Sequence, residues 1–156
     1  MGPIQNPENQ NLEKRIKRHV IAKPHRFFAA TLPGLEALCL DELKRTGIPA
    51  TDAVVATGGI EFTGRLHDLY LANLTLRTTN RLLMRLGTFT AANFRQLEKK
   101  LDQVPWELFV TPEATCMLNV TSKQSRLIHT KAIEERFKNS MARENSTAGR
   151  FSSRKP

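Results

Sequence analysis

The chain has 156 residues and a net charge of +9, with 40% hydrophobic and 25% charged residues. This length fits one ordinary domain or two small ones. Residues 1–24 lack the apolar core of a signal peptide, and no apolar run approaches the ~20 residues that a membrane helix needs. We therefore expect a cytoplasmic protein that does not enter a membrane.

The charge is distributed unevenly along the chain. Residues 1–26 carry +4, residues 27–70 carry −3, residues 71–110 carry +3 and residues 111–156 carry +5. A basic chain attracts polyanions by long-range electrostatics and by release of counterions. Nucleic acid is therefore an expected partner, and solvated basic side chains without a specific partner are the alternative.

The first segments of the chain predict an arm, a strand and a helix. Residues 1–24 are polar and contain three prolines, which favours a mobile basic arm. Residues 26–31 are an apolar run typical of a buried strand. Pro33 suits the first turn of a helix, whose apolar residues recur at helical spacing to Leu43, and Gly47 is placed to end it.

A hairpin is predicted after this helix. Residues 53–57 are rich in β-branched side chains, and residues 60–63 alternate between apolar and polar. Gly58 and Gly59 lie between the two segments and can adopt positive φ angles without steric cost. We therefore predict a two-residue turn at these glycines.

A second helix over residues 66–76 and a fourth strand over residues 81–88 complete the first unit. The order is then β-α-β-β-α-β, which predicts an α+β class and a ferredoxin-like domain over residues 25–88.

The remaining sequence predicts a second, smaller unit. Its expected elements are a helix over 93–104, a helical turn over 105–109, a strand over 115–121 and a helix over 127–137. Trp106 is the only tryptophan and is expected to anchor the joint between the two units. The last residues, 140–156, are polar and basic, so we expect a disordered tail.

Catalytic and metal-binding patterns are not found in the sequence. The four histidines lack partners at triad or metal spacing, and no glycine-rich phosphate loop or Rossmann turn is present. Cys39 and Cys116 are expected to be two buried thiols in a reducing cytosol. The residues alone predict a binding domain with no metal and no cofactor, rather than an enzyme.

The best candidate for RNA contact is the basic loop before the last helix. A polar loop at a helix N-terminus exposes backbone N–H groups and the positive end of the helix dipole, which suits phosphate. The candidate residues are Lys123, Ser125, Arg126, His129, Thr130 and Lys131. The alternative is an ordinary helix capped by Ser125 with a solvated basic face.

A second candidate patch precedes and enters the fourth strand, at Arg77 and Arg81, with Arg85 following. These arginines could instead pair with carboxylates on neighbouring helices. The carboxylates considered are Glu36, Asp41 and Asp68. We expect one of the arginines to be paired in this way and the rest to be solvated.

Four stretches in order resemble the THUMP-containing RNA methyltransferases, bacterial enzymes that modify guanine in large-subunit ribosomal RNA. They are the opening from Phe28 to Leu43, the hairpin from Gly58 to Phe62, the arginine-rich Arg77 to Arg85, and SRLIHT from Ser125 to Thr130. The resemblance implies that a ferredoxin-like domain and a THUMP domain together bind structured RNA. It also implies that a later domain transfers a methyl group from S-adenosylmethionine, a cofactor expected only in full-length relatives.

The resemblance ends before a THUMP domain would be complete. It implies a basic arm over 1–24, a ferredoxin-like domain over 25–88, the N-terminal part of a THUMP α/β unit over 89–139 and a disordered tail over 140–156. The leading hypothesis is an RNA-binding module that docks ribosomal RNA. The alternative is a protein-docking fragment that self-associates through an uncovered apolar face. A third is that the chain belongs to an active methyltransferase whose catalytic domain lies outside it.

Overall fold

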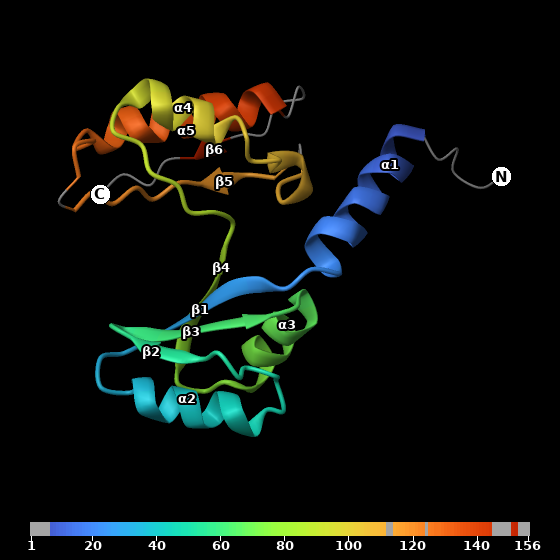
Figure 1. Ribbon diagram of the computed structural model, residues 1–156, viewed down its shortest axis with the longest axis vertical. Coiled ribbons are helices and arrows are strands. Elements are labelled where there is room, and N and C mark those ends of the chain that lie inside the picture. The colour runs from blue at the N-terminus through green and yellow to red at the C-terminus, as the bar shows by residue number, and fades with distance from the viewer. Residues whose placement is uncertain (1–6, 112–113, 124, 145–150, 153–156) are drawn as a thin grey trace. The chain divides into compact units, whose positions relative to one another are not determined.

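The computed structural model describes residues 7–111, 114–123, 125–144 and 151–152. The chain divides into two compact units, Met1–Leu86 and Gly87–Pro156 (Figure 1). No helix within the described residues is long and apolar enough to cross a membrane.

The part of the first unit that follows the N-terminal arm contains a four-stranded antiparallel sheet and two helices. Its elements are β1 (His25–Thr31), α2 (Glu36–Arg45), β2 (Val54–Ala56), β3 (Gly59–Gly64), α3 (Leu66–Thr75) and β4 (Thr79–Arg85). The strand order is β2-β3-β1-β4, so β1 is central and β4 is an edge. The predicted α+β class and ferredoxin-like topology are confirmed.

The core of this unit lies on one face of the sheet. Side chains alternate along a strand, so every second residue of β1 and β3 faces the helices. The buried cluster contains Phe27, Ala29, Ile60 and Phe62 of the sheet, Cys39 and Leu43 of α2, and Ala72 of α3. The rings of Phe27 and Phe62 lie 5.5 Å apart between centroids. The opposite face of the sheet carries the alternate residues.

Helical residues precede the sheet within the range predicted as a mobile arm. Helix α1 spans Pro7–Ile16 and continues into a π-helical turn, η1, over Lys17–Ile21. Val20 is buried, and its carbonyl oxygen lies 2.7 Å from Nε2 of His25 at the start of β1. The end of the arm is therefore attached to the start of β1.

The turn before α2 differs from the prediction that Pro33 begins the helix. The helix starts at Glu36, and Leu35 N donates to Leu32 O at 3.1 Å. Pro33 therefore occupies the second position of a β-turn and Gly34, with φ 91°, the third, as in a type II turn. Gly47, with φ 77°, follows the end of α2 as predicted.

The hairpin between β2 and β3 turns one residue earlier than predicted. Ala56 pairs with Gly59, so Thr57 and Gly58 form the turn, and Gly58 has φ 80°. Gly59 is instead a buried strand residue. A Cβ on Gly59 would collide with the carbonyl oxygen of Ala29 and lie 2.7 Å from the ring of Phe28. The second glycine is needed for close strand contact and not for a positive φ.

The second unit packs two helices around a small core. Its elements are α4 (Phe94–Leu101), the 3-10 turn η2 (Trp106–Leu108), β5 (Cys116–Met117), α5 (Thr130–Glu144) and β6 (Phe151–Ser152). The buried cluster consists of Leu97, Leu101, Trp106, Leu127 and Met141. Trp106 Nε1 donates to Leu101 O at 3.1 Å and to Ser140 Oγ at 3.3 Å. The tryptophan thus belongs to the core of this unit.

Two elements of the second unit differ in length from the prediction. Helix α5 continues past Phe137 to Glu144, into the range predicted as a tail, because Ser140 and Met141 are buried. The strand predicted over 115–121 is reduced to Cys116–Met117, and Leu118 packs on the core. Most of the predicted tail, residues 145–150 and 153–156, lies outside the described residues.

The two cysteines differ in burial. Cys39 is fully buried in the first core, and its sulfur lies 3.4 Å from Oγ1 of Thr79. Cys116 is only half-buried, so the expectation of two buried thiols is wrong for Cys116. The short strand β5 does not enclose its side chain.

Gly59→Ala should destabilise the first unit by about 1–3 kcal/mol, because the added methyl group forces β3 away from β1. Thermal unfolding and amide hydrogen exchange in β1 and β3 would measure this. Gly87→Ala is the matched control, since a Cβ there meets nothing within 4 Å. Equal stability of the two variants would contradict the close contact at Gly59.

Met141→Ala should destabilise the second unit by about 2–4 kcal/mol, because it leaves a cavity beside Trp106. Denaturant unfolding followed by the fluorescence of this single tryptophan reports on the second unit. Met117→Ala, at an exposed side chain of β5, should change little. A Met141 variant as stable as the Met117 variant would show that α5 does not continue into the core.

Candidate nucleic-acid interface

The loop before α5 is held closed by its own serines. Ser122 Oγ donates to Leu127 O at 2.7 Å, and Leu127 N donates to Ser125 Oγ at 3.1 Å. Leu127 is buried in the second core. One apolar side chain and two hydroxyl groups therefore fix the path of a loop whose neighbouring side chains face solvent.

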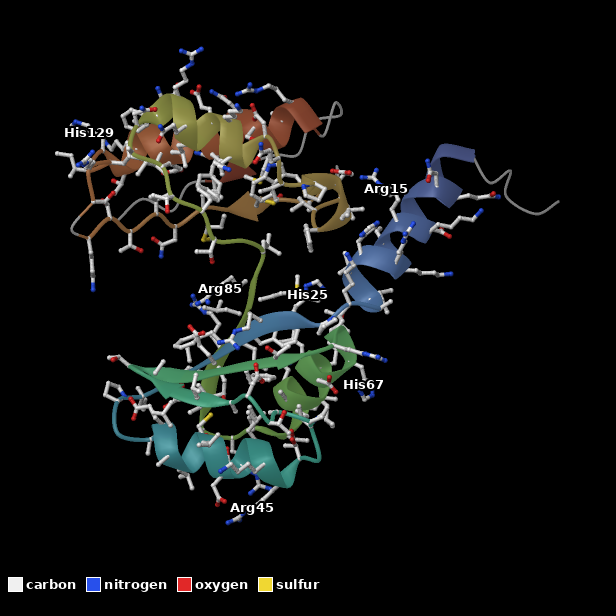
Figure 2. All side chains as sticks on the ribbon, viewed as in Figure 1. Arg15, His25, Arg45, His67, Arg85 and His129 are labelled. Atoms are coloured by element: carbon white, nitrogen blue, oxygen red, sulfur yellow. The ribbon has the colours of Figure 1, made fainter. Side chains whose placement is uncertain are left out.

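Helix α5 begins four residues later than an N-cap at Ser125 would require. Its first residue is Thr130, and the carbonyl of His129 accepts from Ile133 N at 3.1 Å. The alternative that Ser125 is the helix cap is therefore wrong, because its hydroxyl group serves the loop instead. Figure 2 shows His129 at the N-terminal end of α5.

Most side chains proposed for phosphate contact in this stretch are exposed. The exposed residues are Lys123, Ser125, Arg126, His129 and Lys131. Thr130 is half-buried in the first turn of α5. The stretch therefore combines three permanent cations with the positive end of a helix. Gln124, within the same stretch, lies outside the described residues.

Arg77 and Arg81 belong to the first unit, whereas the other six candidate residues belong to the second. Arg77 N donates to Glu42 Oε2 at 3.1 Å, and the side chain of Arg77 is exposed. Arg81 is an exposed residue of β4 that pairs with Ala30 of β1.

The side-chain hydroxyl of Thr78, followed by the backbone N–H of Thr78, lowers the pKa of Glu42. The carboxylate thereby fixes the start of β4.

Of Arg77, Arg81 and Arg85, Arg85 forms an ion pair, and its partner lies on a neighbouring strand. Glu36 accepts from the backbone of Gly34 and Gly58, Asp41 pairs with Arg45, and Asp68 accepts from Arg65 N. Arg85 Nη2 instead lies 2.7 Å from Glu61 Oε1 on β3. The expected pairing of one arginine with a helix carboxylate is therefore wrong, because all three helix carboxylates have other partners.

Glu61 is the centre of a network that the sequence reasoning missed. Its second oxygen lies 3.0 Å from Arg26 Nη2, and Arg26 Nη1 lies 2.8 Å from Asp52 Oδ2. The hydrogen bond from Arg85, followed by that from Arg26, lowers the pKa of Glu61. The sequence signal was that Arg26 and Glu61 each alternate with apolar neighbours along a strand. The strand register was also needed to show that these two side chains meet.

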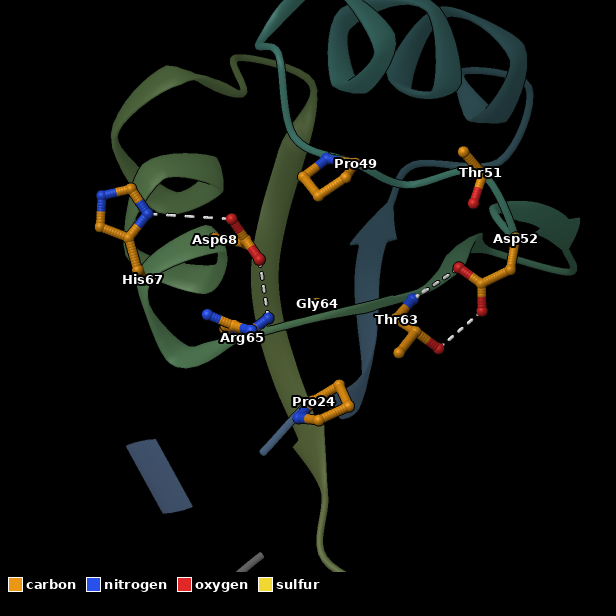
Figure 3. A pocket seen from close by; sticks show the side chains of 9 residues that line it. All are labelled: Pro24, Pro49, Thr51, Asp52, Thr63, Gly64, Arg65, His67 and Asp68. Atoms are coloured by element: carbon orange, nitrogen blue, oxygen red, sulfur yellow. Dashed lines mark hydrogen bonds and ion pairs between the residues drawn. The ribbon is translucent and has the colours of Figure 1, made fainter. Parts of the chain in front are cut away.

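Asp52 joins this network to a polar depression. Thr63 donates to it from both Oγ1 (2.6 Å) and N (3.0 Å), and these bonds, then Arg26, lower the pKa of Asp52. The depression has a volume of about 730 Å³ and is also lined by Arg65, His67 and Asp68 (Figure 3). Its carboxylates are engaged by the chain itself. No group of three potential metal ligands occurs within the described residues.

The family model of the RlmL ferredoxin-like domain matches residues 26–83, which run from β1 into β4. Over these residues the first unit is therefore similar to the RlmL ferredoxin-like domain. This similarity agrees with the topology of the sheet and with the resemblance noted in the sequence.

Relatives extend the similarity beyond the RlmL ferredoxin-like domain. The chain is 33% identical over 116 residues to the ribosomal RNA large subunit methyltransferase K/L of Methylococcus capsulatus, covering 74% of this chain and 15% of that protein. It is 30% identical over 118 residues to the protein of the same name from Syntrophotalea carbinolica, covering 76% and 16%. The chain thus spans less than a fifth of either relative.

Solved structures also match across both units. A predicted N6-adenine-specific DNA methylase from Listeria monocytogenes has a TM-score of 0.68 and 26% identity, covering 91% of this chain and 34% of that chain. SMU.472, described as a methyltransferase and solved as a complex with SAH, has a TM-score of 0.71 over 80% of this chain and 32% of that chain. At 24% sequence identity, this match shows that the two chains share a fold and shows nothing about function.

Glu61→Gln should destabilise the first unit at neutral pH and make its stability less sensitive to acid. The folded pKa of Glu61 is lowered, so its contribution is complete above the unfolded value near 4.3 and is lost as the pH falls through the folded value. Thermal unfolding between neutral and acidic pH would measure this. Asp41→Asn, which breaks an exposed helical pair, should leave stability nearly unchanged. A Glu61 variant with the wild-type pH profile would refute the network.

Proposed function

We propose that this chain is an RNA-binding module that docks structured ribosomal RNA for a methyltransferase catalytic domain outside these residues. The observation that carries the proposal is the row of exposed cations at the N-terminal end of α5. The names of the relatives support ribosomal RNA as the ligand.

The chemistry of this stretch suits phosphate oxygens. Lys123, Arg126 and Lys131 supply positive charge, and Arg126 can donate two parallel hydrogen bonds. The backbone N–H groups in the first turn of α5 point out of the N-terminal end of the helix, which this stretch precedes. Ser125 and His129 add polar contacts, and Thr130 offers a hydroxyl group at the helix start. Contacts of this kind read RNA by shape and charge, not by sequence.

The domain assignment follows from the same proposal. Residues 25–88 are the ferredoxin-like domain, and residues 89–139 correspond to the N-terminal part of a THUMP domain. Guanine-N2 methylation of large-subunit RNA is the reaction of the full-length relatives that the resemblance implies. Arg77 and Arg81 form a second RNA-facing patch on the first unit.

The first unit does not offer the kind of cradle in which a Rossmann domain holds S-adenosylmethionine. A Rossmann cradle needs a glycine-rich turn between a parallel strand and a helix. The sheet of the first unit is antiparallel, and its Gly58 and Gly59 belong to a β-hairpin. In our proposal the cofactor and the transfer of the methyl group belong to the catalytic domain of a full-length relative.

A protein-docking fragment is the second candidate function. Ile128, within the proposed RNA stretch, is 67% exposed and would suit an apolar partner or a second copy of the chain. Leu118, however, packs on the second core and so does not extend this surface. RNA docking therefore explains more of the exposed side chains in the stretch.

Replacing both Lys123 and Arg126 by alanine should weaken binding to structured ribosomal RNA and reduce the slope of log K against log salt by about 1.5. Two phosphate contacts are lost in this variant. Fluorescence anisotropy across a salt series would measure both quantities. The matched control replaces Lys99 and Lys100, exposed residues of α4, and removes the same charge from the same unit.

The control variant separates a specific surface from net charge. If both double variants lose affinity equally, binding is nonspecific and the site assignment fails. If the wild-type chain dimerises in sizing experiments and does not bind RNA at low salt, the docking function replaces the proposed one.

A further inference from the structure

The face of the first sheet opposite α2 and α3 carries an aromatic ring among arginines. Strand alternation places Arg26, Phe28 and Ala30 of β1 on this face, because Phe27 and Ala29 are in the core. The neighbouring strands contribute Glu61 and Thr63 of β3, Arg81, Leu83 and Arg85 of β4, and Val54 of β2. Figure 2 shows Arg85 on this side of the sheet and Arg45 of α2 on the other.

Phe28 lies at the centre of this face and is partly exposed. Its Cα partners are Glu61 on one side and Leu83 on the other. The ring reaches over Gly59, where a Cβ would lie 2.7 Å from its Cζ. The absence of a side chain at Gly59 therefore leaves room for the ring beside the backbone of β3. Leu83, 45% exposed, extends the apolar surface toward the edge strand.

The charges around Phe28 favour an anionic ligand. Arg26 and Arg85 share Glu61, and Asp52 also engages Arg26. Within the described residues Arg81 makes no ion pair, and it lies on the edge strand β4 with Arg85. Three arginines against two carboxylates leave the face positive. Arg81 is the arginine whose charge is not compensated, and its strand β4 lies next to β1, which carries Phe28.

We propose that this open face binds single-stranded RNA, with one unpaired base stacked on Phe28 and the adjoining phosphate against Arg81. Base stacking on an exposed aromatic ring of a four-stranded sheet needs no sequence-specific hydrogen bonds. The guanidinium group of Arg81 supplies the charge that the phosphate requires. This surface is separate from the phosphate contacts proposed at α5, and it gives the chain a means of recognising unpaired bases.

The test uses the full 156-residue chain and a short single-stranded RNA that carries one 2-aminopurine. Stacking quenches the fluorescence of this base analogue. Phe28→Leu keeps an apolar side chain but loses the π face, so binding should weaken roughly tenfold and quenching should disappear. Phe28→Tyr keeps the ring and should retain both. Circular dichroism of each variant verifies the fold.

Arg81→Gln should weaken binding and lower the salt slope by about one unit, because one phosphate contact is lost. Arg45→Gln removes the same charge from α2 on the other side of the sheet and should have little effect. Equal effects of these two substitutions would overturn the placement of the phosphate on β4.

The outcomes separate this inference from the proposed function. The Lys123 and Arg126 double variant should still quench 2-aminopurine, although it binds structured RNA poorly. If Phe28→Leu binds and quenches like the wild-type chain, the sheet face does not hold a base, and the proposed function is unaffected. If the wild-type chain ignores the probe at low salt and Phe28→Leu instead reduces dimerisation, the face is a protein interface.

Discussion

The close contact between the backbones of Gly59 and Ala29 determines how β3 lies on β1, and the rest of the first unit depends on this register. It places Ile60 and Phe62 against the helices and Glu61 on the opposite face. A shift of one residue would exchange the two sets of side chains and bury a carboxylate in the core. The same contact leaves the space over which the ring of Phe28 extends. Core, ion-pair network and candidate stacking surface thus share one constraint.

The strand register also explains the role of Glu61, which offsets the repulsion between two arginines. Arg26 and Arg85 are direct Cα partners on adjacent strands, and like charges in that position destabilise a sheet. Glu61 lies within hydrogen-bonding distance of both guanidinium groups and neutralises part of their charge. Arg81, four residues before Arg85, lies beyond this network. The side chain that stabilises the sheet therefore also determines which arginine stays available to a ligand.

Much of the first unit could be predicted from the sequence because its signals are local. Alternation of apolar residues defined β1 and β3, helical spacing defined α2 and α3, and Gly47 marked the end of α2. The errors arose where two local explanations compete. Pro33 is compatible with a helix start and with a turn, and either glycine of the Gly58-Gly59 pair could adopt positive φ. Only the pairing of Ala56 with Gly59 decides the second case.

The second unit was less predictable because distant contacts determine its elements. Met141 and Ser140 extend α5 only because Trp106 packs beside them, and a polar sequence conceals this. The hydroxyl group of Ser125 resembled a helix cap, yet it bonds within the loop. The candidate cations could be chosen from the sequence, since exposure of lysine and arginine is the usual case. Their roles in binding RNA, like those of Arg77 and Arg81, stay predictions.

The two proposed surfaces act through different physics, and this difference would select a particular kind of RNA. Phosphate contacts at Lys123 and Arg126 release counterions, so they weaken with salt and ignore sequence. Stacking on Phe28 requires a base that is free of its own helix, and it accepts any base because every base has a π face. A continuous duplex could satisfy only the first surface, and a flexible single strand would use chiefly the second. An RNA that contains both a helix and an unpaired base offers a ligand to each of the two surfaces.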